Sequence, residues 1–344
     1  MQTRMLSVRW WSMAVLLSSL LPHAAGLAAP PEAASGTEPI DSARWLARIN
    51  AAARERNYQG TMVFTVGGAV SSSKVAHFCV GDQSFERLEA LDGKMRKVYR
   101  HNETVQTVWP QSALAVIEKR GALSNLPSNL QTVDPRALEQ YELKAEGRER
   151  LAGREALVFL LQPRDEWRFA QRVWADQASG LMLRADVLGQ GRVVLESAAF
   201  SEIEIGVRPQ PDSVLLPLRK LDGLKVLRPL QSPTQLETEG WSLKALVPGF
   251  RLSSCVRRSL DRGGSGEPSP PGGEVVQAVF TDGLTHVSLF IEPFDASRHR
   301  KDLSTQIGAT HTLMLRRGDH WLTALGDVPL ATLMRFAEAI ERRR

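Results

Sequence analysis

The sequence predicts an α+β fold that is mostly antiparallel β-structure and is divided into two domains. The chain has 344 residues, 43% of them hydrophobic, which is enough for two packed cores and excludes wholesale disorder. From about residue 61 onward, short apolar runs alternate with turn residues, a pattern typical of antiparallel sheets and barrels. A proline-rich stretch, residues 206–235, divides these runs into two groups. Two cysteines cannot staple a chain of this length, so a disulfide-framed fold is excluded.

The N-terminal residues have the three parts of a secretory signal peptide. Arg4 and Arg9 precede the apolar run Trp10–Leu21, and small residues follow it. We expect residues 1–28 to be cleaved on export and residues 29–40 to form a flexible spacer. An uncleaved anchor would need about 20 apolar residues, more than this run supplies. Loss of the two arginines lowers the formal net charge from +5 to +3, which is too mild to suggest a polyanion-binding protein.

The first domain is expected over residues 41–205. It begins with a helix over residues 42–56, because Leu46, Ile49 and Ala53 recur at helical spacing. The period then changes to two, and strands are expected at Thr61–Val66, Val75–Val80, Phe85–Leu91, Met95–Arg100, Val105–Trp109, Leu114–Ile117, Tyr141–Ala145, Ala156–Leu161, Phe169–Trp174, Leu181–Val187 and Val193–Ala199. Residues 121–138 interrupt the pattern with two prolines, and we expect a short helix or a lid there.

The second domain is expected over residues 236–344. Residues 206–235 contain five prolines and are expected to be an interdomain linker with room for one short helix. Strands are expected at Trp241–Leu246, Phe250–Arg257, Val275–Thr281, His286–Ile291, Thr310–Leu315 and His320–Leu325, with a flexible hairpin loop at residues 263–273. A final helix begins after Asp327-Val328-Pro329, and its expected buried stripe is Leu333, Phe336, Ala337 and Ile340.

The two cysteines, Cys79 and Cys255, leave two alternatives. Export would place them in an oxidising compartment, where a disulfide would join the two halves of the chain. Otherwise they are separate thiols that pack as small hydrophobic side chains, which is the interpretation that we favour.

Catalytic and metal-binding motifs are missing from the sequence. It contains no H-E-x-x-H, C-x-x-C, G-x-S-x-G or phosphate-binding glycine loop. None of the seven histidines stands at metal-ligand spacing; His77 and His101 are expected on strands or turns, and His299 in a solvated basic loop. Carboxylates such as Asp165 and Asp176 are more typical of turns than of paired acid–base catalysts. Basic residues are dispersed without interleaved aromatics, which argues against nucleic-acid binding. We therefore expect no enzyme, no cofactor and no metal.

Several strands carry apolar residues on both faces. In Ala156–Leu161, one face presents Leu157, Phe159 and Leu161, whereas the other presents Ala156, Val158 and Leu160. A sheet that is apolar on both faces needs cover on both, or an apolar ligand on one. The first domain offers one clear helix as cover, so we expect an apolar groove; helices over the second face are the alternative.

Local motifs follow one another in a characteristic order from Ser42 to Ile340. They include Asn57-Tyr58-Gln59-Gly60-Thr61-Met62-Val63-Phe64, Glu86-Arg87-Leu88-Glu89-Ala90-Leu91-Asp92-Gly93, Trp174-Ala175-Asp176, Ser179-Gly180-Leu181-Met182-Leu183, Val247-Pro248-Gly249-Phe250, Thr281-Asp282-Gly283-Leu284 and Gly318-Asp319. Together they resemble the RseB/MucB regulators of the sigma-E envelope-stress pathway. The sequence departs from the family pattern at two places, which bear on details of the surface. Phe169 and Ala170 stand where the family has a Tyr-rich strand, and residues 263–273 form an insertion.

The resemblance implies a first domain similar to the lipoprotein carriers LolA and LolB, an unclosed antiparallel barrel with helices across its mouth, and a smaller α+β second domain. It implies a periplasmic negative regulator that binds the periplasmic region of an anti-sigma factor similar to RseA or MucA and shields it from the site-1 protease. Lipopolysaccharide or lipid acyl chains would compete and release it. A periplasmic lipoprotein or lipid carrier is the alternative, although simple carriers lack the second domain. The oligomeric state stays open, a homo-oligomer included.

Candidate site residues follow from size, charge and position. Large, mainly apolar side chains on predicted strands of the first domain are candidates for binding acyl chains, with ordinary core packing as the alternative; they are Met62, Phe64, Tyr99, Trp109, Phe159 and Trp174. Basic side chains in loops of the second domain are candidates for binding an acidic partner segment or a lipid phosphate, with a plain solvated surface as the alternative; they are Arg298, Arg300, Lys301, Arg316 and Arg317.

Overall fold

The computed structural model describes residues 42–119, 134–259 and 274–343. The predicted signal peptide (residues 1–28), the spacer (29–40) and the glycine-rich loop (263–273) lie outside the described residues, as does most of the interruption at 121–138. The described end of that interruption forms a short 3-10 helix, Pro135–Glu139, and the Asp134 side chain caps it by accepting a hydrogen bond from the backbone N–H of Arg136.

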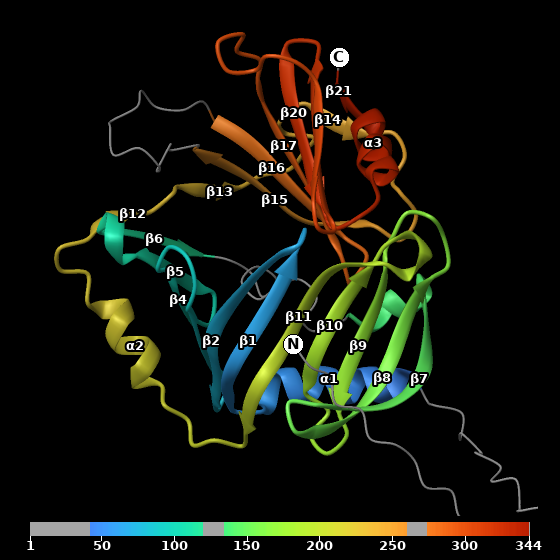
Figure 1. Ribbon diagram of the computed structural model, residues 1–344. Coiled ribbons are helices and arrows are strands. Elements are labelled where there is room, and N and C mark those ends of the chain that lie inside the picture. Colours follow the sequence, from blue (N-terminus) through green and yellow to red (C-terminus); the bar gives the residue numbers. More distant parts are fainter. Residues whose placement is uncertain (1–41, 120–133, 260–273, 344) are drawn as a thin grey trace, which may run out of the picture. The chain divides into compact units, whose positions relative to one another are not determined.

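A large antiparallel sheet follows helix α1 (Ser42–Glu55). Its strands are β1 (Tyr58–Val66), β2 (Ala69–Val80), β3 (Gln83–Ala90), β4 (Lys97–His101), β5 (Thr104–Trp109), β6 (Leu114–Lys119), β7 (Tyr141–Leu151), β8 (Arg154–Pro163), β9 (Ala170–Asp176), β10 (Met182–Leu188), β11 (Val194–Ile205) and β12 (Lys225–Leu227). The order is β12-β6-β5-β4-β3-β2-β1-β11-β10-β9-β8-β7, antiparallel throughout except for β12 beside β6 (Figure 1). Within the described residues the edge strands β12 and β7 do not pair with each other, so the sheet is unclosed, as predicted.

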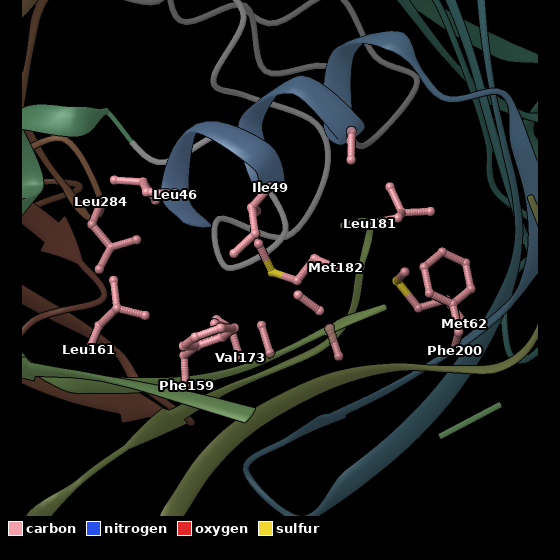
Figure 2. Close-up of a cluster of buried hydrophobic side chains, with 14 of the residues drawn as sticks. Leu46, Ile49, Met62, Phe159, Leu161, Val173, Leu181, Met182, Phe200 and Leu284 are labelled. Atoms are coloured by element: carbon pink, nitrogen blue, oxygen red, sulfur yellow. The ribbon is translucent and has the colours of Figure 1, made fainter. Parts of the chain in front are cut away.

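Helix α1 packs on one face of this sheet, which we call the inner face. Leu46, Ile49 and Ala52 are almost fully buried against side chains of β1 and β8–β11, whereas the predicted Ala53 is only half-buried. Figure 2 shows Leu46 and Ile49 directed toward the side chains of the sheet. The helical spacing of these residues therefore serves to cover the inner face of one half of the sheet.

Helix α2 (Asp212–Arg219) covers the opposite, outer face of the other half. Its fully buried Val214 packs in a cluster with Phe78, Phe85 and Tyr99. Strand β12 then extends the sheet along β6. The predicted linker, residues 206–235, thus holds the one short helix that was expected, but its middle belongs to the first domain because it completes an apolar core there.

The second domain is a seven-stranded antiparallel sheet with helix α3 (Leu330–Ala339) packed on it. The strand order is β13 (Gln231–Pro233), β15 (Arg251–Ser259), β16 (Glu274–Thr281), β17 (His286–Pro293), β20 (His320–Gly326), β19 (Thr310–Arg317) and β18 (Leu303–Ile307). The predicted α+β class of this domain is therefore confirmed. Strand β18 escaped prediction because all five of its residues are exposed, so no buried face patterns its sequence.

The last helix is shorter than predicted. It ends at Ala339, and Ile340 has an extended backbone that begins β21 (Ile340–Arg342), which pairs with β14 (Trp241–Leu243). Ile340 remains buried in the same core as Leu333 and Phe336. The apolar stripe was therefore identified correctly, and pairing with β14 decides where the helix stops.

A buried ion pair connects the two domains. Arg168, just before β9, donates from Nε to Oδ2 of Asp282 at 2.6 Å, and neither side chain has any exposed surface. The Tyr141 hydroxyl donates to the same carboxylate oxygen at 3.1 Å, and Arg168 also donates to the carbonyl of Pro248. Leu284, two residues after Asp282, is buried in the α1 core. Arg168 also pairs with Asp165 through Nη1, so two carboxylates share this buried guanidinium.

Candidate functional site

The six apolar candidates do not form a single site. Met62 and Phe159 are buried in the core beneath α1, and Phe64 packs at the edge of that core. Tyr99 lies on the outer face under α2, and Trp174 lies in a separate outer cluster. Successive strand residues point to opposite faces, so Tyr99 and Trp174 cannot share a groove with the inner-face candidates.

Protein side chains fill both faces of β8. Phe159 and Leu161 pack under α1 on the inner face, and Ala156 and Val158 pack with Trp174 on the outer face. The two-faced apolar pattern was identified correctly, but it does not mark a groove at this strand. Two cavities that involve candidate residues lie instead on the inner face, around β1 to β5.

The first cavity is an open groove of about 600 Å³, which we call the Trp109 groove. Two of the candidates, Phe64 on β1 and Trp109 on β5, line it together with Leu88 on β3. The exposed side chains of Lys94 and Arg96, between β3 and β4, also line it. The Asp92 carboxylate lines the same groove, so the apolar wall stands beside two cations and one anion.

The second cavity, which we call the His77 cavity, has a volume of about 530 Å³ and lies between the end of α1 and the turn that joins β2 to β3. Met62 and Phe200 contribute apolar surface, and Tyr58, His77 and Glu86 contribute polar groups. Met62 and Phe200 are directly opposed on β1 and β11, and Figure 2 shows them side by side. The cavity is therefore apolar toward the α1 core and polar toward β2 and β3.

His77 lies in the middle of a buried polar cluster. Its Nδ1 is 3.3 Å from Oε1 of Glu86, its Nε2 is 3.1 Å from Sγ of Cys79, and its ring stacks on Tyr58 with centroids 5.3 Å apart. Burial opposes a charge on the ring, but the contacts with Cys79 and Glu86 outweigh burial and raise the pKa of His77 to about 9. The imidazole is therefore cationic at neutral pH.

Glu86 is the anionic partner in this cluster. Its Oε2 is 3.4 Å from Nη1 of Arg100, while Oε1 faces His77. Burial acts to raise the pKa of Glu86, but His77 and Arg100 outweigh it and hold that pKa below its ordinary value. A carboxylate, an imidazolium and a guanidinium thus share one partly enclosed site.

Sequence reasoning gave His77 no role beyond structure. The pattern that could have revealed it is His77-x-Cys79, because strand residues two apart lie on the same face. Glu86 could not be found in this way, because it reaches His77 only through the register that places the two residues opposite each other on β2 and β3.

Both cysteines are free thiols, as we favoured. Cys79 is half-buried on β2, and Cys255 is buried on β15 in the core of the second domain. Burial raises the pKa of the Cys255 thiol to about 11, and Glu239 and Glu237 add to the effect.

The basic candidates of the second domain are Arg298, Arg300, Lys301, Arg316 and Arg317. The structure brings the two loops that carry them together, because the Arg316 guanidinium lies 4.0 Å above the ring of Phe294 and the Phe294 N–H donates to the carbonyl of Asp319. Arg298 donates to Asp295 at 2.8 Å, and Arg317 donates to the carbonyl of Ala337 at 3.0 Å. These arginines are thus already engaged within the domain.

The loop around His299 is less solvated than predicted. His299 is only 8% exposed and stacks on Trp321, with centroids 4.8 Å apart and ring planes 4° apart. Its Nε2 is 3.4 Å from Glu292. Aromatic packing therefore anchors the loop, and Arg300 and Lys301 are its exposed basic side chains.

Metal-ligand groups and membrane-spanning helices can be assessed only in the described part of the chain. It contains no group of three or more His, Cys, Asp or Glu side chains placed to hold a metal ion. Nor does any of its helices combine the length and apolar character that crossing a bilayer requires.

Comparison with known proteins places both domains in one family. The model of the MucB/RseB N-terminal domain matches residues 41–218, and that of the MucB/RseB C-terminal domain matches residues 235–341. The chain is 29% identical to the sigma factor AlgU regulatory protein MucB of Pseudomonas aeruginosa over 97% of this chain and 98% of that protein. It is 26% identical to the sigma-E factor regulatory protein RseB of Escherichia coli K12, over 96% and 97% of the two chains.

Solved structures agree with this result. A crystal structure of MucB in complex with MucA(peri) matches with a TM-score of 0.65 and 27% identity, covering 88% of this chain and 100% of that chain. A Pseudomonas aeruginosa MucA/MucB complex matches with a TM-score of 0.66 and 27% identity, covering 88% and 99%. The resemblance in the sequence motifs is confirmed, and the chain belongs to the MucB/RseB family.

Proposed function

We propose that this chain is a periplasmic, non-enzymatic negative regulator of sigma-E-type envelope-stress signalling. It binds the periplasmic region of a membrane-spanning anti-sigma factor and shields that region from the site-1 protease. Lipopolysaccharide or another acylated lipid competes for the protein and releases the anti-sigma factor. One observation carries the proposal: both family domains are present, in a chain that matches regulators of this kind over nearly its full length.

Support for the partner comes from the relatives. Two matched structures are complexes of MucB with MucA, and together with the sequence matches they span both domains of this chain. The alternative, a simple lipid or lipoprotein carrier, leaves the second domain and its contact through Arg168 and Asp282 without a purpose. Arg300 and Lys301 are the exposed basic side chains that we propose for contact with an acidic segment of the partner.

Support for lipid binding comes from the Trp109 groove. Phe64, Leu88 and Trp109 offer apolar contact to an acyl chain, and Lys94 and Arg96 offer positive charge to a phosphate. A lipid A-type molecule carries both features, whereas an uncharged lipid would leave the two cations unused. We therefore propose an acylated, anionic lipid as the ligand of this groove.

A pulldown with the periplasmic part of the anti-sigma factor, with and without lipopolysaccharide, tests both parts. We expect binding that lipopolysaccharide reverses, and protection of the anti-sigma factor from site-1 cleavage that is lost in parallel. Absence of binding would overturn the regulatory proposal. Binding that lipopolysaccharide leaves unchanged would overturn only the lipid-sensing part.

Charge-reversal variants locate the lipid. The pair Lys94→Glu and Arg96→Glu should require about tenfold more lipopolysaccharide for release, because it places negative charge beside the lipid phosphate. The pair Arg148→Glu and Arg150→Glu on β7 makes the same charge change at exposed positions away from the groove. If both pairs weaken release equally, net charge rather than the groove controls lipid binding.

A further inference from the structure

Cys79, His77 and Glu86 form a continuous chain of contacts that the proposed function does not use. Sγ of Cys79 is 3.1 Å from Nε2 of His77, and Nδ1 of the same ring is 3.3 Å from Oε1 of Glu86. Tyr58 stacks on the ring at an interplanar angle of 16°, which restricts its orientation. A sulfur, an imidazole and a carboxylate in this order are the arrangement that activates a cysteine nucleophile.

The strand register builds this chain of contacts. His77 and Cys79 lie two residues apart on β2 and share its inner face, and Glu86 is the direct partner of His77 on β3. Arg100, on β4, is the direct partner of Glu86 and holds its second carboxylate oxygen. The sheet therefore orients the three groups without help from a mobile loop.

The sulfur of Cys79 can be reached from solvent. Cys79 is half-buried and lines the His77 cavity, whose volume of about 530 Å³ admits a small ligand. Cys255 provides a contrast within the same chain, because it is only 8% exposed and packs in the core of the second domain. The two thiols thus differ in access and in their neighbours.

The immediate neighbours of the Cys79 sulfur are a cationic ring and a backbone carbonyl. The pKa of His77, raised to about 9, keeps the ring protonated at neutral pH, so a cation stands at hydrogen-bond distance from the sulfur. In the resting state the thiol donates to the backbone carbonyl of Arg54. A cation at hydrogen-bond distance from the sulfur is a neighbour typical of reactive cysteines.

We propose that Cys79 is a peroxide-reactive thiol, which His77 and Glu86 position for oxidation to a sulfenic acid by a hydroperoxide in the His77 cavity. The thiolate attacks one peroxide oxygen, the O–O bond breaks, and an S–O bond forms. Sulfur loses two electrons and the peroxide gains them. The departing hydroxide or alkoxide takes a proton from the His77 imidazolium, which regains one from solvent. No further oxidant is needed.

The lining of the cavity suits two kinds of hydroperoxide. Hydrogen peroxide can enter from solvent. Met62, Leu181 and Phe200 are almost fully buried but line the cavity, so they place apolar groups beside the chain of an acyl hydroperoxide. The shared chemistry is the O–O bond. This inference does not depend on anti-sigma factor binding, so the two proposals can fail separately.

The test uses the full chain with a dimedone-type probe, which labels sulfenic acids and ignores oxidised methionines such as Met62. The protein is treated with hydrogen peroxide in one arm and linoleic acid hydroperoxide in the other, and labelling at Cys79 and Cys255 is followed by mass spectrometry. With at least one of the two peroxides, we expect Cys79 to be labelled at least about tenfold faster than Cys255. Cys79 should also be labelled faster in the native chain than in the urea-unfolded chain. Equal or slower labelling in the native chain with both peroxides would overturn the proposal.

Variants then test the positioning residues. His77→Gln should slow labelling of Cys79 about tenfold or more, while the control His101→Gln, on β4, should leave it unchanged. The labelling rate of Cys79 should fall once the pH exceeds the pKa of His77, because the ring then has no proton for the departing oxygen. Glu86→Gln removes the carboxylate that helps to raise that pKa, so the rate should fall at a lower pH than in wild type. Unchanged rates in folded His77→Gln, checked by circular dichroism, would show that His77 does not activate the thiol.

Discussion

Raising the pH from 6.5 to 9 should destabilise this protein because His77 loses its charge. The contacts with Cys79 and Glu86 raise the pKa of His77 from 6.5 to about 9 in the folded chain. A group whose pKa is higher in the folded state adds stability that is fully present below its unfolded pKa. That stability is lost as the pH rises through the folded value.

The size of the effect follows from the same shift. One pKa unit corresponds to about 1.4 kcal/mol, so the charged ring contributes about 3 kcal/mol to the free energy of unfolding at pH 6. For a domain whose total stability is about 5–15 kcal/mol, that is a large share. Glu86 has its effect at acidic pH. Its lowered pKa adds stability that is lost as the pH falls below the ordinary pKa value of 4.5.

Urea denaturation between pH 6.5 and 9 measures this contribution. The wild-type free energy of unfolding should fall by about 3 kcal/mol more than that of His77→Gln over this range. Both proteins in this comparison should also carry Cys255→Ser. The raised pKa of Cys255 makes stability fall once thiols ionise in the unfolded chain, and the substitution removes that effect. A nuclear magnetic resonance titration of the His77 ring gives the pKa directly. Parallel pH profiles for the two chains, or a ring that titrates near 6.5, would refute the reasoning.

Three further predictions concern folding. Asp282→Asn should lower the free energy of unfolding by about 1.5–3 kcal/mol, because it removes one of the two carboxylates that pair with the buried Arg168 guanidinium and leaves Asp165 as the other. A urea-denaturation midpoint equal to that of wild type would contradict this. Val214→Ala should cost about 1–2 kcal/mol and speed proteolysis around α2, whereas unchanged proteolysis would mean that α2 does not depend on this contact. Gly60→Ala should lower the free energy of unfolding by about 2 kcal/mol or more, because its Cβ would lie 2.3 Å from the carbonyl oxygen of Glu202. A variant as stable as wild type would show that β1 and β11 can shift apart.

Much of the fold was predictable because it rests on local periodicity. The three-to-four spacing of Leu46 and Ile49 located α1, and alternation located nearly all of the longer strands. The failures share a cause. Strand β18 lacks a buried face, and Ile340 continues a helical stripe into a strand, so neither could be identified from the local pattern.

The candidate site was only partly predictable. Size and apolarity selected Phe64 and Trp109, which the structure brings to one groove, but the same criteria selected Tyr99 and Trp174 on the outer face. Size cannot tell the faces apart, because a large apolar side chain is equally suited to a core and to a ligand cavity. Family resemblance adds the class of function and leaves the position of the groove open.

The amino-acid pattern alone established the order of the elements, the division into two domains and the family, because each depends on residues close together in the chain. Tertiary pairing decided the rest. Register placed His77 opposite Glu86, and the meeting of β1 and β11 set Met62 against Phe200 across 138 positions of sequence. Which side of a sheet is covered by a helix, and which is left open as a cavity, depends on such long-range pairings. No local pattern encodes them, because the free energy that selects them comes from burying distant segments against each other.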